Sequence, residues 1–557
     1  MIRLDDIKTR NDFADFLKIK KKLLTYILYV KNVDSMYTSF TIPKKSGGER
    51  IINAPSRELK SIQKKLAVIL WEHQKHIRNE KNIKSNISHA FEKDKSILTN
   101  AKIHRNKRFV LNVDLENFFD SFHFGRVRGF FAKSNDFKLP LEVATIIAQL
   151  SCYKGCLPQG APSSPIITNL MCQILDMRIL KIAKKYKLDY TRYADDLTFS
   201  TNNKRFLETN QQFIHELHKE IVHAGFAINE SKTRLLFKDS KQQVTGLVVN
   251  KKINVDRCYY KTTRAMANTL YLTGSFTING TVATTRQLEG RFSFINQVER
   301  YSKEANSEKT HSTRLSSSRE EQYRKFLFYK YFLANEKPLI LTEGKTDVRY
   351  IKAALKSLVD GYPDLLSKSD AGAFKFKLSF LNRTKRLRYF FKLGLDGADT
   401  MQNICNFYFG RNGFPNYMAY FKTKFNIQPR SPVILIFDNE LDIKEKPLYK
   451  LAKHVGNIDK DSLSKNLYAR LSENLYIATI PIPPEKNEAE MEDLFDSSVL
   501  SHKIDGRSFS SKAEDGCYGK DIFSKYIMQN YATIDFSQFK PFLNCVNQIV
   551  KSYSSDG

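Results

Sequence analysis

The spacing of apolar residues in the first 300 positions predicts a mixed α and β region. Residues 57–77 carry apolar side chains at helical spacing, whereas residues 108–115 form an apolar run of the length of a strand. Further along, residues 304–322 are rich in serine and charged residues and show no apolar periodicity. Such a segment is typical of a linker or an exposed loop. The pattern therefore predicts a break near residue 320 between two folding units.

After this break the pattern changes to continuous apolar strands. Residues 337–343, 431–438 and 475–482 are apolar runs of strand length, and helix-length segments separate them. A short turn joins the first run to residues 348–358, whose apolar side chains share one helix face. Continuous apolar strands that alternate with helices indicate a mainly parallel sheet. The second unit is therefore predicted to be an α/β domain.

The net charge of the chain indicates the kind of partner that it binds. Its 557 residues include 90 Lys and Arg against 59 Asp and Glu, a formal net charge of +31. A charge of that size favours a polyanionic partner such as nucleic acid. No run approaches the roughly 18 apolar residues of a membrane helix, and the first residues lack the apolar core of a signal peptide. We therefore expect a cytoplasmic protein with no membrane partner.

The seven cysteines do not predict a covalent framework. Their number is odd, they are scattered along the chain, and a reducing cytosol disfavours disulfides. Cys152 and Cys156 lie four residues apart, but no second ligand pair is near them in the sequence. We expect ordinary thiols here in preference to a zinc site.

Two adjacent aspartates interrupt a strand-like sequence. Asp195 and Asp196 stand between residues 190–193 and 197–199 in a strand–turn–strand pattern. A solvated turn would explain them, because aspartate is an ordinary turn residue. The alternative is catalytic: Asp114 also ends an apolar run, and three carboxylates at strand ends would hold two Mg²⁺ ions roughly 4 Å apart. The cations would then offset the repulsion between the neighbouring acids.

The segments around these acids resemble the motifs of reverse transcriptases. YADD (193–196) and LPQGAPSSPIITNL (157–170) occur with an aspartate-bearing strand upstream of both. The resemblance implies an α+β right-hand polymerase with fingers, palm and thumb. It also implies that Asp114, Asp195 and Asp196 are the catalytic ligands of two Mg²⁺ ions in the palm.

Other positions match the nucleotide-binding motifs of the same family. Phe119 corresponds to the aromatic residue under the deoxyribose, where a bulky ring would exclude a 2′-hydroxyl. IPKKSGGERIINAP (42–55) resembles the fingers motif, in which a basic glycine turn suits a triphosphate. Without the family, a lysine-rich turn is usually a solvated surface. The nucleotide-binding residues that the resemblance implies are Lys44, Lys45, Arg50, Phe119, Gln159, Gly160 and Lys232.

Two shorter motifs resemble those of retron reverse transcriptases in particular. Residues 100–104 match the NAxxH signature and residues 244–246 match the VTG triplet. Taken singly, the first could be a helix with local hydrogen bonds and the second a strand turn. Residues 254–301 would form the thumb, where basic residues interleave with Tyr259, Tyr260 and Phe292 and suit an RNA backbone and its bases. The implied RNA-binding residues are Asn100, His104, Val244, Thr245, Gly246, Arg257, Lys261, Arg264 and Arg291.

This resemblance implies a polymerase that copies one structured non-coding RNA. Retron enzymes start from the 2′-hydroxyl of an internal guanosine and leave branched multicopy single-stranded DNA (msDNA). The implied partners are therefore the cognate RNA, its msDNA product and dNTPs. A group II intron-type reverse transcriptase and maturase is the alternative polymerase, but it explains neither short motif. A non-catalytic RNA-binding scaffold is the alternative of another class, and the intact acids and Phe119 speak against it.

A second set of acids follows the strands of the C-terminal unit. Glu343 and Asp438 each end an apolar strand, and α/β sheets bind ligands at the carboxyl ends of their strands. The pattern resembles a Toprim domain, the metal-dependent module of topoisomerases, primases and overcoming-lysogenisation-defect-type nucleases. The resemblance implies Glu343 as general acid or base and one or two Mg²⁺ ions. The implied metal ligands are Glu343, Asp438 and Glu440, with Glu492 or Asp493 completing the site.

One feature departs from the Toprim pattern. The usual D-x-D is here Asp438-Asn439-Glu440, and the additional methylene of glutamate moves the carboxylate by about 1.5 Å. This puts full nuclease activity in question. The alternative is an α/β domain that only binds nucleic acid or forms oligomers. Residues 396–404 belong to a crossover of this domain without an assigned role.

A subset of retrons carries a C-terminal Toprim fusion, and this chain resembles that subset over nearly its full length. Retrons resemble anti-phage systems, so we expect bound msDNA to restrain the nuclease until infection disturbs it. Retron particles commonly assemble, which makes a homo-oligomer a further partner to test beside the nucleic-acid substrate of the Toprim domain. The predicted divisions are fingers and palm at 1–250, thumb at 251–303, linker and connecting helix at 304–335, and the Toprim-like nuclease at 336–557.

Overall fold

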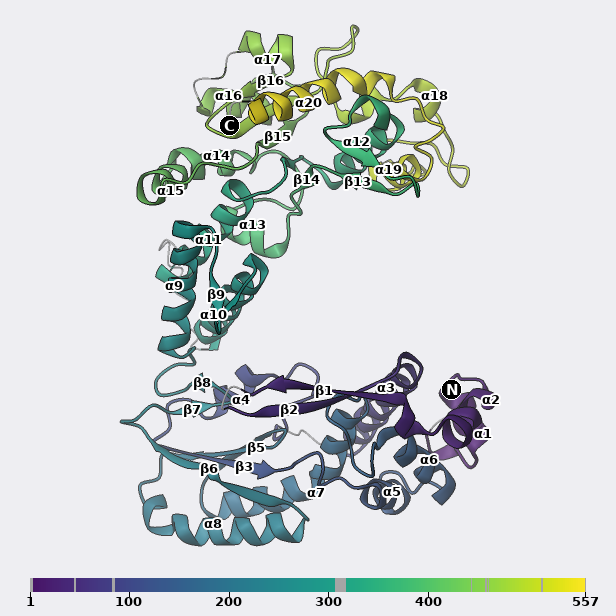
Figure 1. Cartoon of the computed structure of the whole chain (residues 1–557), viewed down its shortest axis with the longest axis vertical. Helices are drawn as coiled ribbons and strands as arrows, with labels where there is room; N and C mark the ends of the chain where they lie inside the picture. Colours follow the sequence, from purple (N-terminus) through teal and green to yellow (C-terminus); the bar gives the residue numbers. More distant parts are fainter. Residues whose placement is uncertain are drawn as a thin grey trace. The chain divides into compact units, whose positions relative to one another are not determined.

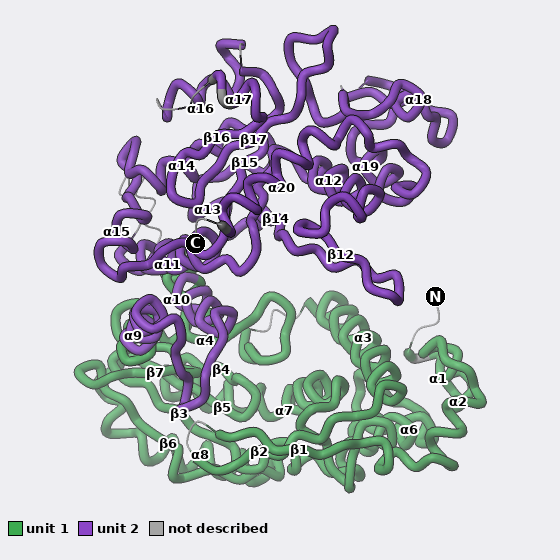
Figure 2. The backbone as a smooth tube through the Cα atoms, turned by 45° about the horizontal axis from the view of Figure 1, so that its top comes forward, with its two compact units in different colours: residues 1–260, 297–311 green, residues 261–296, 312–557 purple. Residues whose placement is uncertain are grey.

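The whole chain is drawn in Figure 1 from a computed structural model, which forms two compact units. Unit 1 consists of Met1–Tyr260 and Gln297–His311, and unit 2 consists of Lys261–Asn296 and Ser312–Gly557 (Figure 2). None of the described helices is long and apolar enough to cross a membrane. The structure describes residues 4–44, 47–82, 86–305, 317–441, 443–455, 458, 460–511 and 514–555.

The centre of unit 1 is a four-stranded antiparallel sheet in the order β4-β5-β3-β6. Its strands are β3 (Phe109–Glu116), β4 (Asp189–Tyr193), β5 (Asp196–Thr201) and β6 (Ala227–Phe237). Two long helices, α7 (Ser164–Lys185) and α8 (Phe206–His223), cover one face of this sheet (Figure 1). The interior strand β3 corresponds to the apolar run predicted at 108–115, and it is buried at nearly every position.

A long hairpin and a long helix precede this sheet in the chain. β1 (Tyr37–Pro43) and β2 (Glu49–Pro55) pair antiparallel. The helix predicted at 57–77 is α3 (Arg57–Glu80), and the Ser56 side chain caps it by accepting the Leu59 N–H. Other elements of unit 1 include α1 (Arg10–Phe16), α2 (Lys21–Thr25), α4 (Ile97–Ile103), α5 (Phe124–Lys133), α6 (Leu141–Ser151), β7 (Gln243–Val244) and β8 (Leu247–Val248).

Unit 2 is built on a five-stranded sheet in the order β14-β11-β15-β17-β16. The first four strands run parallel and β16 pairs antiparallel at the edge. The three apolar runs predicted as strands form β11, β15 and β17, with the parallel pairing that their pattern indicated. The strands are β11 (Leu339–Leu341), β14 (Ser379–Phe380), β15 (Val433–Phe437), β16 (Tyr468–Arg470) and β17 (Leu475–Thr479).

Helices cover both faces of this sheet. Successive residues of a strand point to opposite faces, so each strand contributes side chains to two hydrophobic clusters. Ile434 and Ile436 pack in one hydrophobic cluster with α12 (Lys345–Ser357), α19 (Lys520–Gln529) and α20 (Lys540–Ser555). Val433 and Leu435 pack in the other. That second cluster includes residues of α9 (Arg257–Thr273), α10 (Thr285–Ala305), α11 (Ser318–Phe328), α13 (Lys385–Phe391), α14 (Gln402–Phe409), α15 (Tyr417–Phe425), α16 (Pro447–Val455) and α17 (Lys460–Asn466).

The helices predicted as a thumb share this second core. The Phe292 ring stacks on the Tyr323 ring with centroids 5.4 Å apart, and the Tyr271 ring meets the Phe421 ring at 5.0 Å. Residues 261–296 therefore group with the C-terminal part of the chain, and the compact units do not follow the predicted divisions at 303 and 335. The apolar face of a helix in the sequence predicts that the helix packs against something, but it does not identify the packing partner.

The predicted linker is described only in part, and the cysteines are described in full. Residues 306–316 lie outside the described part of the chain, while the end of the predicted linker is helical and belongs to α11. Ser317 caps that helix through a capping box with Glu320, a signal that the serine-rich composition obscured. All seven cysteines are free, as expected.

Candidate active site and a second carboxylate cluster

β3 and β5 bring the three aspartates of unit 1 together. Asp114 and Asp196 are Cα partners in the antiparallel pairing of these strands. The Leu115 N–H also donates to the Asp195 carbonyl at 3.0 Å. Directly opposed residues of antiparallel strands have Cα atoms about 4.5–5.5 Å apart. The three carboxylates therefore start from neighbouring backbone positions at one end of the sheet.

The turn that carries Asp195 is strained. Tyr193 and Asp196 pair across it, which leaves Ala194 and Asp195 as a two-residue turn. Ala194 has a φ of 59°, in the left-handed region that costs alanine roughly 1 kcal/mol. Such strain persists only where the surroundings fix the backbone.

A buried ion pair supplies that fixation. Arg192 is fully buried and donates to both carboxylate oxygens of Asp176 on α7, at 2.8 and 2.9 Å. The Tyr190 O–H donates to the same carboxylate at 2.9 Å, and Asn169 Oδ1 accepts from the guanidinium at 3.3 Å. The β4–β5 hairpin is thereby tied to α7. This pair was not among the predictions, although an arginine inside a short strand, with Tyr190 and Tyr193 on either side of it, was a signal for it.

Burial and repulsion make the aspartates costly to ionise together. Burial raises the pKa of Asp196 to about 7, with further contributions from Asp195 and Asp114. Burial and Asp114 also raise the pKa of Asp195. A site of this kind favours a cation among the three carboxylates.

Lys232 supplies one positive charge from within the chain. β6 pairs Arg234 with Asn112 but Asn229 with Asp114, so β6 bulges between these two pairs. Bulges re-aim side chains beside active sites. Lys232 lies in this bulge, and its Nζ is 3.0 and 3.2 Å from the two carboxylate oxygens of Asp114.

The aspartates and most of the predicted nucleotide-binding residues line one cavity of about 1180 Å³. Lys44 and Arg50 reach it from the β1–β2 hairpin, and Phe119 reaches it from the segment after β3. The Phe119 ring is held edge-on by Phe118, with centroids 5.5 Å apart. The predicted residues that line the cavity are Lys44, Arg50, Asp114, Phe119, Gln159, Asp195, Asp196 and Lys232.

Two further predicted residues need separate treatment. Lys45 lies outside the described residues. Gly160 instead allows a close backbone approach: its φ is 121°, and a Cβ there would lie 2.7 Å from the Asn53 carbonyl oxygen. The Asn53 N–H donates to the Gln159 carbonyl at 2.8 Å, so the loop that carries Gln159 is fastened to β2.

The predicted RNA contacts of Asn100 and His104 are wrong, because both side chains are completely buried. The His104 ring nitrogens lie 2.8 Å from Ser200 Oγ and 2.7 Å from Thr191 Oγ1. The Thr191 O–H also donates to Asn100 Oδ1. Burial lowers the pKa of His104 to about 3, so the ring is neutral. These residues brace β4 and β5 against α4 from inside unit 1.

The VTG residues form a tight hairpin turn. Val244 pairs with Leu247, while Thr245 and Gly246 between them have φ values of 45° and 81°. Two successive positive φ angles are typical of a type I′ turn. Val244 is fully buried, which contradicts its predicted RNA contact; Gly246 is exposed.

The predicted thumb residues separate in the same way. Arg257, Lys261 and Arg264 are exposed on α9, whereas Arg291 is half-buried and donates to Thr263 Oγ1 at 3.0 Å. Phe292 is buried in the core of unit 2 and cannot stack on a base, which corrects the prediction for that ring.

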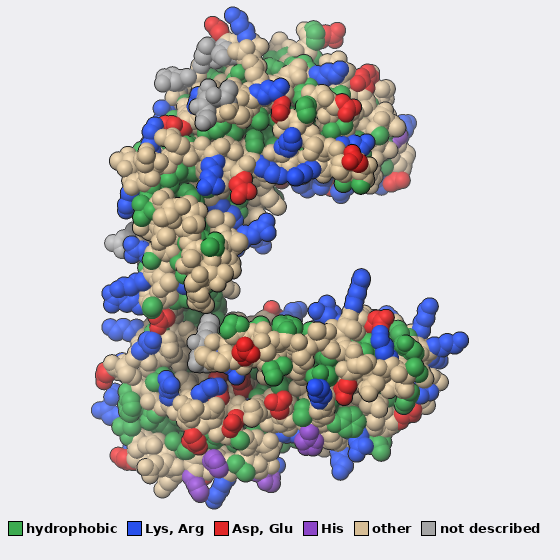
Figure 3. Space-filling model, viewed as in Figure 1, with side chains coloured by type: hydrophobic (Ala, Val, Ile, Leu, Met, Phe, Trp, Pro, Cys, Tyr) green, Lys and Arg blue, Asp and Glu red, His purple; other side chains and the backbone are tan. Residues whose placement is uncertain are grey.

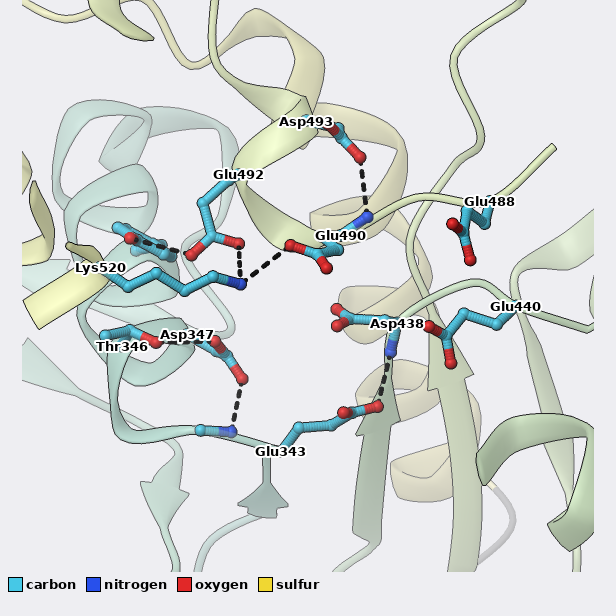
Figure 4. Close-up of polar contacts among 12 residues, drawn as sticks. Glu343, Thr346, Asp347, Asp438, Glu440, Glu488, Glu490, Glu492, Asp493 and Lys520 are labelled. Atoms are coloured by element: carbon cyan, nitrogen blue, oxygen red, sulfur yellow. Dashed lines mark hydrogen bonds and ion pairs between the residues drawn. The ribbon is translucent and has the colours of Figure 1, made fainter. Parts of the chain in front are cut away.

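Unit 2 gathers its acids at a topological switch point. The chain leaves β11 for β14 on one side and later reaches β15 on the other. Ligands bind outside the carboxyl ends of strands at such a point. Glu343 follows β11 and Asp438 follows β15, and the Asp438 N–H donates to Glu343 Oε1 at 3.0 Å (Figure 4). Burial raises the pKa of both acids, and Glu343 raises that of Asp438 further.

Residues outside the predicted set complete this cluster. Figure 4 shows Asp347 and Lys520 around the same space as Glu343 and Asp438. Asp347 accepts the Gly344 N–H at 2.8 Å and caps α12. Lys520 Nζ lies 2.9 Å from a Glu490 oxygen. It is also 3.0 Å from an oxygen of Glu492, whose other oxygen accepts the Tyr350 O–H at 3.2 Å. Asp347 lies four residues after Glu343 and Glu490 two residues before Glu492, so local spacing could have pointed to them. Lys520 is 28 residues from Glu492, and only the fold brings it to the cluster.

The two other predicted ligands are placed differently. Glu440 is buried and accepts from Lys446 at 2.7 Å. Asp493 accepts the Glu490 N–H at 2.9 Å, as Figure 4 shows, and pairs with Lys486 at 2.5 Å. Asp493 therefore caps a helical turn, and of the two alternatives Glu492 is the one that borders the cluster.

The donor sets of both sites fit a hard divalent cation. Carboxylate oxygens are the ligands that Mg²⁺ prefers, and in each site an ammonium group already neutralises part of the negative charge: Lys232 at Asp114 and Lys520 at Glu492. Among the described residues, no three His, Cys, Asp or Glu side chains are arranged as a finished metal site.

Residues 42–250 match the family model described as reverse transcriptase (RNA-dependent DNA polymerase). The chain is 35% identical over 294 residues to the Retron Ec86 reverse transcriptase of Escherichia coli, covering 52% of this chain and 84% of that protein. It is 34% identical to the Retron Mx65 and Mx162 reverse transcriptases of Myxococcus xanthus, covering 55% and 54% of those proteins.

Among solved structures, a telomerase from Candida albicans is similar with a TM-score of 0.33 and 11% identity. The match covers 53% of this chain and 62% of the telomerase chain. This likeness is too weak to carry an argument about function.

Proposed function

This chain belongs to the family of retron reverse transcriptases, and from that premise we propose that unit 1 copies a cognate structured RNA into branched msDNA. Polymerisation would start from a 2′-hydroxyl of that RNA. The observation that carries the proposal is the meeting of Asp114, Asp195 and Asp196 in one cavity with Phe119 and Arg50.

Each group of this cavity has a role in nucleotide transfer. Asp114, Asp195 and Asp196 would hold Mg²⁺, which supplies activation of the attacking hydroxyl and charge for the leaving pyrophosphate when it is bound. Lys44, Arg50 and Lys232 offer ammonium and guanidinium donors to the triphosphate. The Phe119 ring narrows the space for the sugar and would reject a 2′-hydroxyl.

Incorporation of labelled dNTP by the co-purified RNA–protein complex tests this proposal. The double variant Asp195→Asn with Asp196→Asn is expected to reduce incorporation to background. Asp189 is an exposed acid on the same β4–β5 hairpin and pairs with Lys107, so the control variant Asp189→Asn should retain incorporation. Sequencing of the co-purified nucleic acid should find a 2′,5′-branched RNA–DNA molecule. Incorporation that survives the double variant would remove the assignment of the site.

We propose further that unit 2 is a Toprim-type nuclease. Glu343 and Asp438 at the switch point support this, with Glu343 as general acid or base and Glu440 and Glu492 as additional carboxylates for Mg²⁺. Asp438→Asn should abolish Mg²⁺-dependent cleavage of nucleic acid, and Asp493→Asn, which alters a cap, should retain it. Cleavage unaffected by Asp438→Asn would favour the alternative of a domain that only binds nucleic acid or forms oligomers.

The two activities suggest a defence mechanism in which bound msDNA restrains the nuclease. Two carboxylate sites on one chain with a net charge of +31 support it. Digestion of the bound msDNA is expected to increase cleavage by unit 2. No gain in cleavage after complete digestion would contradict restraint by the product while leaving the polymerase proposal intact.

A further inference from the structure

One surface of unit 2 places lysines directly over aromatic rings. It is formed by α12, by the hairpin of β12 (Leu366–Lys368) and β13 (Phe374–Phe376), by β14 and by the segment after α19. We call this surface the lysine–aromatic strip. Its members, all at least partly exposed, are Lys352, Lys356, Lys368, Phe374, Phe376, Phe380 and Tyr531.

Each lysine of the strip contacts at least one ring. Lys352 Nζ is 4.9 Å from the Phe380 ring centre. Lys356 Nζ is 5.4 Å from that of Phe374, and Lys368 Nζ lies 5.7 Å from the same ring. Lys356 is also 5.0 Å from the ring centre of Tyr531, which meets Phe374 edge-on at 5.9 Å. Lys352 and Lys356 lie one turn apart on α12, so the two groups of contacts are neighbours along this helix.

The strip ends at the carboxylate cluster. Lys352 and Phe380 also line a cavity of about 410 Å³ whose wall includes Glu343 and Arg383. Arg383 is held in place by donating to the Gly397 carbonyl at 2.8 Å and to the Thr342 carbonyl. A ligand that follows the strip would therefore enter the space beside Glu343 and meet a further cation there. In Figure 3 the edge of unit 2 that carries β14 and β13 shows Lys and Arg side chains close together.

Carboxylates of the described residues leave the charges of the strip uncompensated. In the described part of the chain, Lys352, Lys356 and Lys368 form no ion pair with a carboxylate, whereas Lys345 nearby pairs with Asp521 at 3.2 Å. Cations beside exposed rings are the combination that binds single strands, since phosphates meet the charges and unpaired bases stack on the rings. A duplex keeps its bases stacked on one another, so it offers phosphates and groove edges but no free base faces to the rings.

We propose that the lysine–aromatic strip binds single-stranded nucleic acid and leads it to Glu343. The route to Glu343 rests on the proposed nuclease function of unit 2, but the binding itself does not. The substrate class of that site is therefore a single strand of DNA or RNA. This strand would pass α12 before it reaches the carboxylates.

Photo-crosslinking of the full chain tests this directly. Oligonucleotides that carry 5-iodouracil would be irradiated with the protein, and crosslinked peptides identified by mass spectrometry. We expect crosslinks at Phe374, Phe376 or Tyr531 with single strands and at least fivefold fewer with a duplex. Separate DNA and RNA arms show which strand the site takes, and crosslinks in either arm support the proposal. Crosslinks confined to unit 1, or a duplex as effective as a single strand, would overturn it.

A matched pair of variants separates the strip from general charge. Lys356→Ala with Lys368→Ala should reduce crosslinking at the strip by about tenfold, because two phosphate contacts and their ordering of the strand are lost. Lys424→Ala removes a lysine that lies over Tyr420 and Phe425 elsewhere in unit 2, and it should leave the yield unchanged. Equal yields from both variants would refute the strip. Crosslinks that persist while Asp438→Asn leaves cleavage unaffected would instead refute the nuclease assignment alone.

Discussion

Arg192 carries a full charge at a position with no solvent exposure, and Asp176 is its carboxylate partner. Asp176→Asn would leave the guanidinium buried without a countercharge, which typically costs about 3–5 kcal/mol of unfolding free energy. Urea unfolding followed by fluorescence measures this in unit 1, because Trp71 is the only tryptophan of the chain and lies in α3. The β4–β5 hairpin and its aspartates should loosen with the loss of the pair.

An exposed ion pair of the same unit provides the control. Lys31 and Glu58 lie 2.9 Å apart at the surface, so Glu58→Gln should leave the unfolding midpoint nearly unchanged. If Asp176→Asn were equally mild, Arg192 would not depend on Asp176 for its charge balance.

The buried ring of His104 predicts a pH dependence of a defined sign. Its pKa is about 3 in the folded chain and about 6.5 when unfolded, so below pH 6.5 only the unfolded chain takes up this proton. The stabilising contribution of the neutral ring is therefore complete above pH 6.5 and is lost as the pH falls toward 3. Each pH unit in this range costs at most about 1.4 kcal/mol.

Comparison with a variant isolates this residue from other titrating groups. His104→Gln has no titrating ring, so its unfolding free energy, again followed by Trp71 fluorescence, should fall less between pH 6.5 and pH 5 than that of the unchanged chain. Parallel pH curves for the two proteins would show that His104 does not carry the effect.

Single residues show what sequence could and could not predict. Asp195 and Asp196 were predictable because two adjacent acids in a strand conflict with local preferences, and such conflicts mark sites. His104 was recognised as part of the NAxxH motif but was predicted to contact RNA, because a motif does not reveal whether a side chain is buried. Lys520 was not predictable, because only the folded α/β sheet brings it to Glu492, which precedes it by 28 residues.

At the scale of elements, the joint between β2 and the loop after α6 depends on Gly160. Gly160→Ala would place a methyl group 2.7 Å from the Asn53 carbonyl oxygen, closer than real Cβ contacts allow. The loop that carries Gln159 would then move away from β2 and from the cavity. We expect a several-fold increase in the KM for dNTP, measured by steady-state incorporation.

Gly155 is the matched control for this change. Its φ is 84° and a Cβ there would meet nothing within 4 Å, so Gly155→Ala introduces the same kind of backbone cost without the clash. Equal kinetic effects of the two substitutions would assign the loss to backbone strain and not to the contact with Asn53.

Elements differed in how well their sequence predicted them. β11, β15 and β17 were predictable as apolar runs because both faces of the sheet are covered by helices. β12 and β13 are three residues each, half exposed and joined by a polar loop, and no run of apolar residues announces them. Their position beside α12 follows from tertiary packing.

At the scale of the whole molecule, the division of the chain has a consequence for truncation. A fragment of residues 1–335 ends where the sequence pattern predicts a boundary, but it retains α9, α10 and α11 without their packing partners. Tyr323 would lose Phe390, whose ring centre is 4.7 Å away, and Tyr271 would lose Phe421 at 5.0 Å. We therefore expect the fragment to bind a hydrophobic dye and to aggregate in size-exclusion chromatography.

Co-expression with residues 336–557 should rescue the fragment, because the second piece supplies the missing half of the core. The same co-expression with Phe390→Asp in that piece should fail, since a carboxylate cannot replace a buried ring at this contact. A fragment that stays monodisperse and free of dye would mean that α9 to α11 find a stable arrangement without residues 336–557. The apolar contacts between these helices and residues 336–557 would then contribute little to the fold, and the boundary predicted from the sequence would be the physical one.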